Sequence, residues 1–399
     1  MVIFKPGDII IESYPLVHTV SSKQKAERCD YCFKNSTSLK KCSACKLLRY
    51  CSIGCQSQDW SVHKIECKMP QNDPSDNDIL EISDIRLAHR LIILWAKFPE
   101  ILEQPIETFN GKISFRQIID KFSKEVELIA SRVEFQPLYQ TASPMVLRYF
   151  EKMGISLDHF TIAKLYFISI GNRCDIRDEF LAPIGSGIYV AASYYGFSCD
   201  PNCCQVFDGP KMQLRAIREF NTDEQPPLIA HIDSQLLSPP SSFRNFKRND
   251  LVCGCKRCSS SQKNQQLENL LDLSRKFELC TMDRGFRGDY GPARRAAMRP
   301  ALKKAYNALE KLLCCEKRYF DWPNPYRSVL LSRRVMLDIM LDDHHNTSVH
   351  SVELRNNLLI THGQENSLYK GIKKNIESNS SVMSFSQFGA VGFHGDESR

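Results

Sequence analysis

The sequence lacks a long apolar run and any segment that reads as a secretory leader. Its longest apolar stretch, 91–96 (LIILWA), is far shorter than the ~20 residues that a membrane-spanning helix needs. The start of the chain shows none of the features of a signal or transit peptide. We therefore expect an intracellular protein, in the nucleus, the cytoplasm or both, that makes no contact with a membrane.

The chain has only a small charge imbalance for its size. Its 399 residues include 53 Lys and Arg against 46 Asp and Glu, a net charge of +7. An excess this diffuse permits acidic partners but does not demand nucleic acid. The length supports a sizeable core and two or three domains.

Seventeen cysteines are many for an intracellular chain, and eight potential metal ligands gather in residues 29–67. Their spacing is C-x2-C-x9-C-x2-C-x5-C-x3-C-x7-H-x3-C. Each C-x2-C pair is a short knuckle that aims two thiolates at one ion, and each i,i+4 pair shares one face of a helical turn. Eight ligands complete two tetrahedral zinc sites, whereas a disulfide scaffold would need an oxidising compartment. The predicted ligands are Cys29, Cys32, Cys42, Cys45, Cys51, Cys55, His63 and Cys67.

This pattern resembles the MYND zinc finger over the whole segment. The resemblance implies interleaved sites, with Cys29, Cys32, Cys51 and Cys55 on one zinc and Cys42, Cys45, His63 and Cys67 on the other. It also implies that the finger binds partner proteins, often through proline-rich peptides. We expect Trp60 and Leu47 to fill its small core, and the finger to fold largely independently of the chain around it. Its basic surface is typical of a solvated face, and a site for acidic partners or DNA is the weaker interpretation.

A second motif, SCDPNC at 198–203, resembles the pseudoknot of SET domains, the lysine methyltransferase fold. Two β-rich runs follow it, as in the hairpin of that fold. Further on, Cys253, Cys255 and Cys258 form C-x-C-x2-C, one ligand short of a closed tetrahedral zinc site. The resemblance implies that Cys199 supplies the fourth ligand. We therefore predict a third zinc ion.

The order of these motifs resembles the SMYD family of SET and MYND protein lysine methyltransferases. The implied fold class is α+β: a SET-domain β-fold with an inserted MYND finger, a helical insert and a C-terminal α-helical, tetratricopeptide-like domain, although no strict 34-residue period is visible. We expect a monomer. The predicted divisions are 1–28 (N-terminal part of the SET domain), 29–67 (finger), 68–171 (helical insert), 172–233 (SET core), 234–258 (post-SET zinc cluster), 259–365 (C-terminal helices) and 366–399 (flexible tail).

The resemblance implies methyl transfer from S-adenosylmethionine to a lysine amine, but the chain departs from the family at the site. The family's Asn-His pair is replaced by Gly196 and Phe197, of which neither side chain can hydrogen-bond a cofactor. His231 stands at the tyrosine position, and it can still donate a hydrogen bond or accept a proton. Leu251 replaces an adenine-stacking aromatic, and the chain begins beyond the expected Gly-x-Gly stretch. Asn172 matches a cofactor-contacting asparagine.

Two functions remain open on the sequence alone. One is an S-adenosylmethionine-dependent methyltransferase that acts on histone or other protein lysines, with activity that is weak or lost. The other is a non-catalytic interaction scaffold or transcriptional regulator that works through the finger and the C-terminal helices. The fold does not decide between them, because activity depends on the site.

Overall fold

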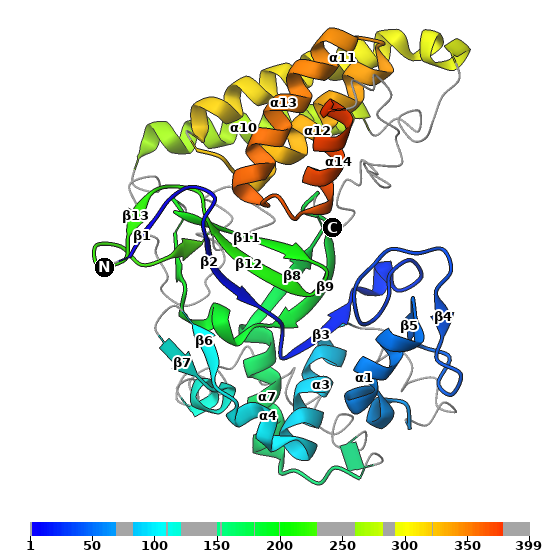
Figure 1. Ribbon diagram of the computed structural model, residues 1–399, viewed down its shortest axis with the longest axis vertical. Helices are drawn as coiled ribbons and strands as arrows, with labels where there is room; N and C mark the ends of the chain where they lie inside the picture. The colour runs from blue at the N-terminus through cyan, green and yellow to red at the C-terminus, as the bar shows by residue number, and fades with distance from the viewer. Residues whose placement is uncertain are drawn as a thin grey trace.

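The computed structural model describes residues 2–68, 83–108, 111–120, 150–151, 154–178, 180–198, 200–229, 260–281, 292–320 and 322–377. Figure 1 shows a C-terminal helical bundle at the top, small β-sheets beneath it, and helices α3, α4 and α7 under the sheets. The cysteine-rich segment lies to one side of the sheets, next to α3. None of the described helices is both long and apolar enough to cross a membrane.

The β-structure joins strands from distant parts of the chain. Strand β2 is the edge of a sheet ordered β11-β12-β2, and β3 is the edge of another, ordered β3-β9-β8. Strand β1 pairs with β13, and β10 runs parallel to β14. The first strands therefore complete sheets whose other strands come after residue 170. The described strands are β1 (Ile3–Phe4), β2 (Ile9–Ser13), β3 (Val17–Val20), β4 (Lys40–Lys41), β5 (Arg49–Tyr50), β6 (Ile106–Thr108), β7 (Gly111–Ile113), β8 (Arg173–Arg177), β9 (Pro183–Ile188), β10 (Gly196–Phe197), β11 (Cys203–Asp208), β12 (Lys211–Ala216), β13 (Phe220–Asn221) and β14 (Leu228–Ile229).

The insert is not wholly helical, contrary to the prediction for 68–171. Strands β6 and β7 form an antiparallel hairpin within it. Gly111 has a φ of 105°, which favours glycine, and the Thr108 hydroxyl donates to the Gly111 carbonyl across the turn (2.6 Å). The Asn-Gly dipeptide at 110–111 is a strong hairpin signal that the helical periodicity around it obscured.

One apolar core lies between α3, α7 and the β3-β9-β8 sheet. It includes Leu91 and Ile92 of α3, Ile168 of α7 and Ile188 of β9, all almost fully buried. The helices of this part and of the finger are α1 (Ile53–Glu66), α3 (Ser83–Lys97), α4 (Pro99–Glu103) and α7 (His159–Gly171), with the 3-10 helices η1 (Ser22–Gln24) and η2 (Val190–Tyr194). Helix α3 therefore reaches the sheet, α7 and the finger at once.

Within residues 260–377, as far as the structure describes them, five helices form the C-terminal bundle and bury two further cores. They are α10 (Ser261–Thr281), α11 (Pro292–Tyr319), α12 (Pro325–Met340), α13 (His344–Thr361) and α14 (Ser367–Glu377). Helix α14 corrects the prediction of a flexible tail over 366–399, because Leu368, Tyr369 and Ile372 are buried against the bundle. Residues 378–399 lie outside the described residues.

The bundle joins the sheets through Arg215 of β12. Its Nε donates to the Ile360 carbonyl (3.2 Å) and its Nη2 to the Gly7 carbonyl (2.6 Å). His362 beside it is buried, and burial together with the Arg215 charge lowers the pKa of His362 to about 4. This histidine is therefore neutral in the folded protein at neutral pH.

Acid should loosen this junction. Unfolded histidine has a pKa of about 6.5, so the neutral His362 stabilises the fold fully above that pH, and its contribution falls as the pH drops towards 4. A shift of this size corresponds to ~3 kcal/mol. The melting temperature of His362→Gln should fall less between pH 7 and pH 4.5 than that of the unchanged protein. A variant of the exposed His345, His345→Gln, should follow the unchanged protein; equal pH dependence of both variants would contradict the assignment.

Candidate functional site

The zinc ligands are held by two knuckle loops, the β4-β5 hairpin and helix α1. Ser52 caps α1, because its hydroxyl accepts a hydrogen bond from the Cys55 amide (3.1 Å). Fixing the start of the helix fixes which ligands face which knuckle. Cys51 and Cys55 join the first knuckle, and His63 and Cys67 join the second.

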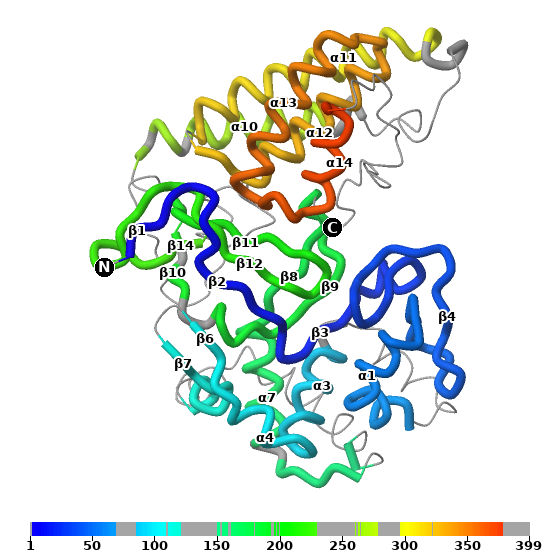
Figure 2. Tube along the Cα trace, viewed as in Figure 1, coloured from blue at the N-terminus to red at the C-terminus, as the bar shows by residue number. Residues whose placement is uncertain are grey.

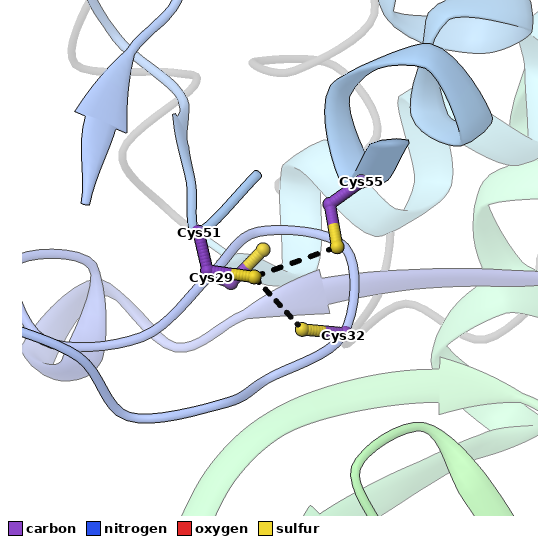
Figure 3. A group of neighbouring side chains, drawn as sticks. All are labelled: Cys29, Cys32, Cys51 and Cys55. Atoms are coloured by element: carbon purple, nitrogen blue, oxygen red, sulfur yellow. Dashed lines mark hydrogen bonds between the residues drawn. The ribbon is translucent and has the colours of Figure 1, made fainter. Parts of the chain in front are cut away.

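The first cluster consists of Cys29, Cys32, Cys51 and Cys55, shown in Figure 3. The Cys51 sulfur lies 3.6 Å from that of Cys32 and 3.5 Å from that of Cys55. Four sulfurs at the usual Zn–S distance are about 3.8 Å apart, so the cluster has the size of a zinc site. A hydrogen bond from the Cys32 thiol lowers the pKa of Cys29 to about 5, which favours the thiolate that binds zinc.

The second cluster consists of Cys42, Cys45, His63 and Cys67 and is more deeply buried. The sulfurs of Cys42 and Cys67 are 3.8 Å apart, and the Cys45 sulfur lies 3.5 Å from Nε2 of His63. The other ring nitrogen of His63, Nδ1, lies 3.4 Å from Glu66 Oε2. A carboxylate on the second nitrogen fixes the imidazole in the orientation a zinc ligand needs. The chain therefore has two zinc-binding clusters in this segment.

A buried ion cluster ties the two zinc sites to helix α3. Nη1 of Arg86 donates to Oδ1 of Asp30 (2.9 Å), within the first knuckle, and its Nε donates to Oε1 of Glu66 (3.1 Å), beside the second site. Arg90, one turn on, donates through Nη2 to Oδ1 of Asp59 (2.8 Å) and through Nε to Oε1 of Glu66 (3.0 Å). All five side chains are at most 4% exposed. We name Asp30, Asp59, Glu66, Arg86 and Arg90 the α3 ion cluster.

Arg86 and Arg90 neutralise the carboxylates of the α3 ion cluster to different degrees. Burial alone would raise the pKa of Glu66, but the Arg86 and Arg90 guanidiniums hold it well below its usual value. Burial raises the pKa of Asp30, which only Arg86 contacts directly among the two. Asp30 is therefore the carboxylate that depends most on Arg86.

The finger also packs against two glycines of the sheet region, Gly185 and Gly209. Phe33, next to the first knuckle, is buried against the β-sheets, and a Cβ on Gly185 of β9 would lie 2.2 Å from its ring. A Cβ on Gly209, at the tip of the β11-β12 hairpin, would lie 2.5 Å from the Cys32 carbonyl. No side chain fits at either position while the finger stays in place. The finger and the sheets share one packed boundary.

These contacts correct two expectations about the finger. It is not independent of the rest of the chain, since both α3 and the sheets supply part of its interior. Its own core is built on Leu48 and Tyr50, which are almost fully buried, with Leu47 packed at the edge. Trp60 is 42% exposed and lies outside that core. Tyr50 takes the interior position because its hydroxyl donates to the buried Asp59 (2.7 Å).

The SCDPNC region forms a second, polar junction at the parallel β10-β14 pair. Asn202 holds it: its Oδ1 accepts from the Leu228 amide (2.7 Å) and its Nδ2 donates to the Pro226 carbonyl (3.0 Å). Gly196 of β10 packs directly on β14, where a Cβ would lie 2.4 Å from Cδ2 of Leu228. Leu228 thus occupies the space that a longer side chain at 196 would take.

Of the other predicted site residues, the structure describes some and not others. Asn172 ends helix α7, and its Nδ2 donates to the Ile168 carbonyl of that helix (3.0 Å), so its amide is engaged in a helix cap. His231 and Leu251 lie outside the described residues, and so do the four predicted ligands of a third zinc, Cys199, Cys253, Cys255 and Cys258. Sequence reasoning missed Arg86 and Arg90; their signal was a pair of arginines within the apolar run of α3.

Residues 29–67 match the MYND finger family. The chain is 31% identical to the SET domain and MYND-type zinc finger protein 6 of Schizosaccharomyces pombe over 268 residues, 66% of this chain and 49% of the relative. It is 25% identical to human histone-lysine N-methyltransferase SMYD3 over 268 residues, 66% of this chain and 59% of the relative. It is 28% identical to N-lysine methyltransferase SMYD2-A of Xenopus laevis over 283 residues, 68% of this chain and 60% of the relative.

The finger with its two zinc clusters, set among mixed helices and strands, defines a MYND-type zinc protein. The wider similarity goes further: over about two thirds of its length the chain is similar to SET and MYND proteins, among them the SMYD lysine methyltransferases. It spans about half to three-fifths of the length of these relatives.

Proposed function

We propose that this chain has a SET β-fold of the protein lysine methyltransferase class and that its transfer of methyl groups from S-adenosylmethionine to protein lysines is weak or lost. The observation that carries this is Gly196, seated against Leu228 where the family resemblance implies an asparagine. The names of the relatives support a protein as the partner. We further propose that the protein is a monomer of the nucleus or cytoplasm.

The described residues at this edge fit the cofactor poorly. Gly196 offers no side-chain donor, and one N–H of the Asn172 side-chain amide is already bonded to its own helix. Each missing hydrogen bond costs about 1 kcal/mol or more, so two or three missing bonds weaken binding by roughly 10–10³-fold. Methyl transfer depends on a cofactor held in line with the amine, so loose binding lowers the rate as well as the affinity.

Calorimetric titration of the zinc-loaded protein with S-adenosylmethionine tests the proposal. The unchanged chain should bind weakly or not at all. The variant Gly196→Asn, Phe197→His, His231→Tyr should regain affinity only when Leu228→Ala makes room beside residue 196. Leu228→Ala alone is the matched control and should leave the affinity for S-adenosylmethionine as weak as that of the unchanged chain. Tight binding and robust lysine methylation by the unchanged chain would overturn the proposal of weak activity, and no binding by the four-residue variant would favour the scaffold.

We also propose a third zinc ion, bound by Cys199, Cys253, Cys255 and Cys258. Elemental analysis of the purified protein should find three zinc ions per chain, because three complete sets of four ligands are present in the sequence. Cys255→Ser should reduce the content to two and leave the finger clusters loaded. A content of two in the unchanged protein would contradict the third site.

A further inference from the structure

Helix α11 holds most of the net charge of the chain. Its 28 residues include eight Lys and Arg and two acidic residues, a net charge of +6 out of +7 for the whole protein. The excess of positive charge over the whole chain is therefore not diffuse, as inferred from the sequence: outside α11 the positive and negative residues almost balance. Figure 2 shows α11 in yellow and orange along the side of the bundle away from the sheets.

Both acidic residues of α11 are paired with arginines of α12, although the Glu310 side chain is 45% exposed. Glu316 is fully buried, where it pairs with Arg327 of α12 and accepts a hydrogen bond from Nδ2 of Asn324 (2.8 Å). Glu310 pairs with Arg334, also of α12. Neither carboxylate is left to balance the cations on the outer face.

The exposed cations of α11 form an interrupted row along the helix, in three groups at 299–304, at 311 and at 317–318. Its exposed members span 19 residue steps, about 28 Å of helix, and within the described residues none of them has an acidic partner. Like charges one turn apart destabilise a helix, and Arg299 and Lys303 are such a pair. We name this set the α11 stripe: Arg299, Lys303, Lys304, Lys311, Lys317 and Arg318.

The rest of this face limits the kind of anion that fits. Among the described residues, the large exposed hydrophobics lie on other elements, such as Trp60 on α1 and Val349 on α13, and none lies on α11. Protein interfaces rely on apolar and aromatic anchors, membrane-surface helices on an apolar face, and single-stranded nucleic acids on aromatic stacking. Contact with the sugar-phosphate backbone needs only Lys and Arg along a row.

We propose that the α11 stripe binds the phosphates of a nucleic acid duplex, without reading its sequence. The site is separate from the basic surface of the finger, which lies on the other side of the sheets (Figure 1). Up to six phosphate contacts predict a slope of about −5 for the logarithm of the binding constant against that of the salt concentration. Binding should then weaken roughly 10³-fold between 50 and 200 mM salt.

Fluorescence anisotropy with a labelled 24-base-pair DNA, titrated with the full chain at several salt concentrations, tests this. The variant Lys303→Gln, Lys311→Gln, Arg318→Gln should reduce the slope by about 3 and the salt effect over that range to roughly 40-fold. The variant Lys40→Gln, Lys41→Gln, Lys64→Gln removes the same charge from exposed lysines of the finger and should keep the original slope.

Three results would overturn the proposal. One is no binding of the duplex at 50 mM salt, and another is an equal loss of slope in both triple variants. The third is competition by poly-glutamate as effective as by unlabelled duplex at equal charge, because the stripe would then accept any polyanion. Thermal melting of both variants should match that of the unchanged protein, which separates lost contacts from lost folding.

Discussion

Arg86→Met should lower the free energy of unfolding by about 3–5 kcal/mol, because the change leaves buried charge without its partner. Asp30 loses the one guanidinium that contacts it directly and keeps the Arg49 amide (2.8 Å), whereas Glu66 keeps Arg90 and His63. The first knuckle and the end of α1 should then shift, and both zinc sites should release their ions faster to a chromogenic chelator. Thermal melting and the rate of zinc release measure the two effects.

A surface ion pair provides the matched control. Nε of Arg116 lies 2.9 Å from Oε1 of Glu103, and both side chains are partly exposed, at 29% and 57%. Exposed pairs contribute about 0–1 kcal/mol, and the contact of the Arg116 guanidinium with the Trp95 ring (3.9 Å) adds about 0.5–1 kcal/mol. Arg116→Met should therefore lower the free energy of unfolding less than Arg86→Met does and leave zinc release unchanged. If Arg86→Met behaved like Arg116→Met, the α3 ion cluster would not stabilise the finger. Asp30→Asn combined with Arg86→Met should recover part of the lost stability, because it removes the buried negative charge that Arg86 no longer neutralises.

Cys42→Ser should unfold the finger and also expose helix α3 to solvent. Structural zinc contributes roughly 10–16 kcal/mol of apparent binding free energy in small fingers, so a cluster with three ligands loses most of that stabilisation. Once α1 unfolds, Asp59 and Glu66 leave Arg90 without its carboxylates in the interior. Hydrogen exchange at the amides of residues 86–94 should therefore rise together with that of the finger.

The same measurement contains its own reference. Residues 329–337 of α12 lie in the C-terminal bundle, distant from the finger in Figure 1, and should keep their protection. Cys314→Ser, at an exposed cysteine of α11 outside the two clusters, should leave both regions protected. Unfolding of residues 42–67 with unchanged exchange in α3 would show that the finger is independent after all.

The zinc ligands could be predicted from the sequence because the chemistry is local. A thiolate or imidazole is recognisable by residue type, and the spacing of Cys51 and Cys55 within one helical turn already brings them together. The interleaving of the two sets came from resemblance, and the structure brings the same two sets together. Ile and Val between breakers mark the strands near the N-terminus in the same way, and β12 falls in one of the β-rich runs predicted after SCDPNC. The pairing of these distant strands was not predicted.

The α3 ion cluster could not be predicted because its members are far apart in the sequence. Periodicity shows that one face of α3 is buried, but not that Arg86 and Arg90 belong to it. Their burial is acceptable only because Asp30, 56 residues earlier, and Glu66 come to the same place. The pair of arginines within the apolar run of α3 is a signal of buried charge, but a pattern along one helix does not identify the carboxylates that it meets.

Phe33 packs against Gly185, so during synthesis the finger cannot dock on the sheets until residue 185 has been made. At a synthesis rate of about 5–20 residues per second, the roughly 150 residues between them take about 10–30 s to make. During that time the finger can bind zinc, but the Phe33 ring is exposed because the surface it packs against does not yet exist. An exposed aromatic ring can be bound by chaperones or by other nascent chains. The finger is among the first parts of the chain to be made, yet it can reach its final place only after residue 209 has been made.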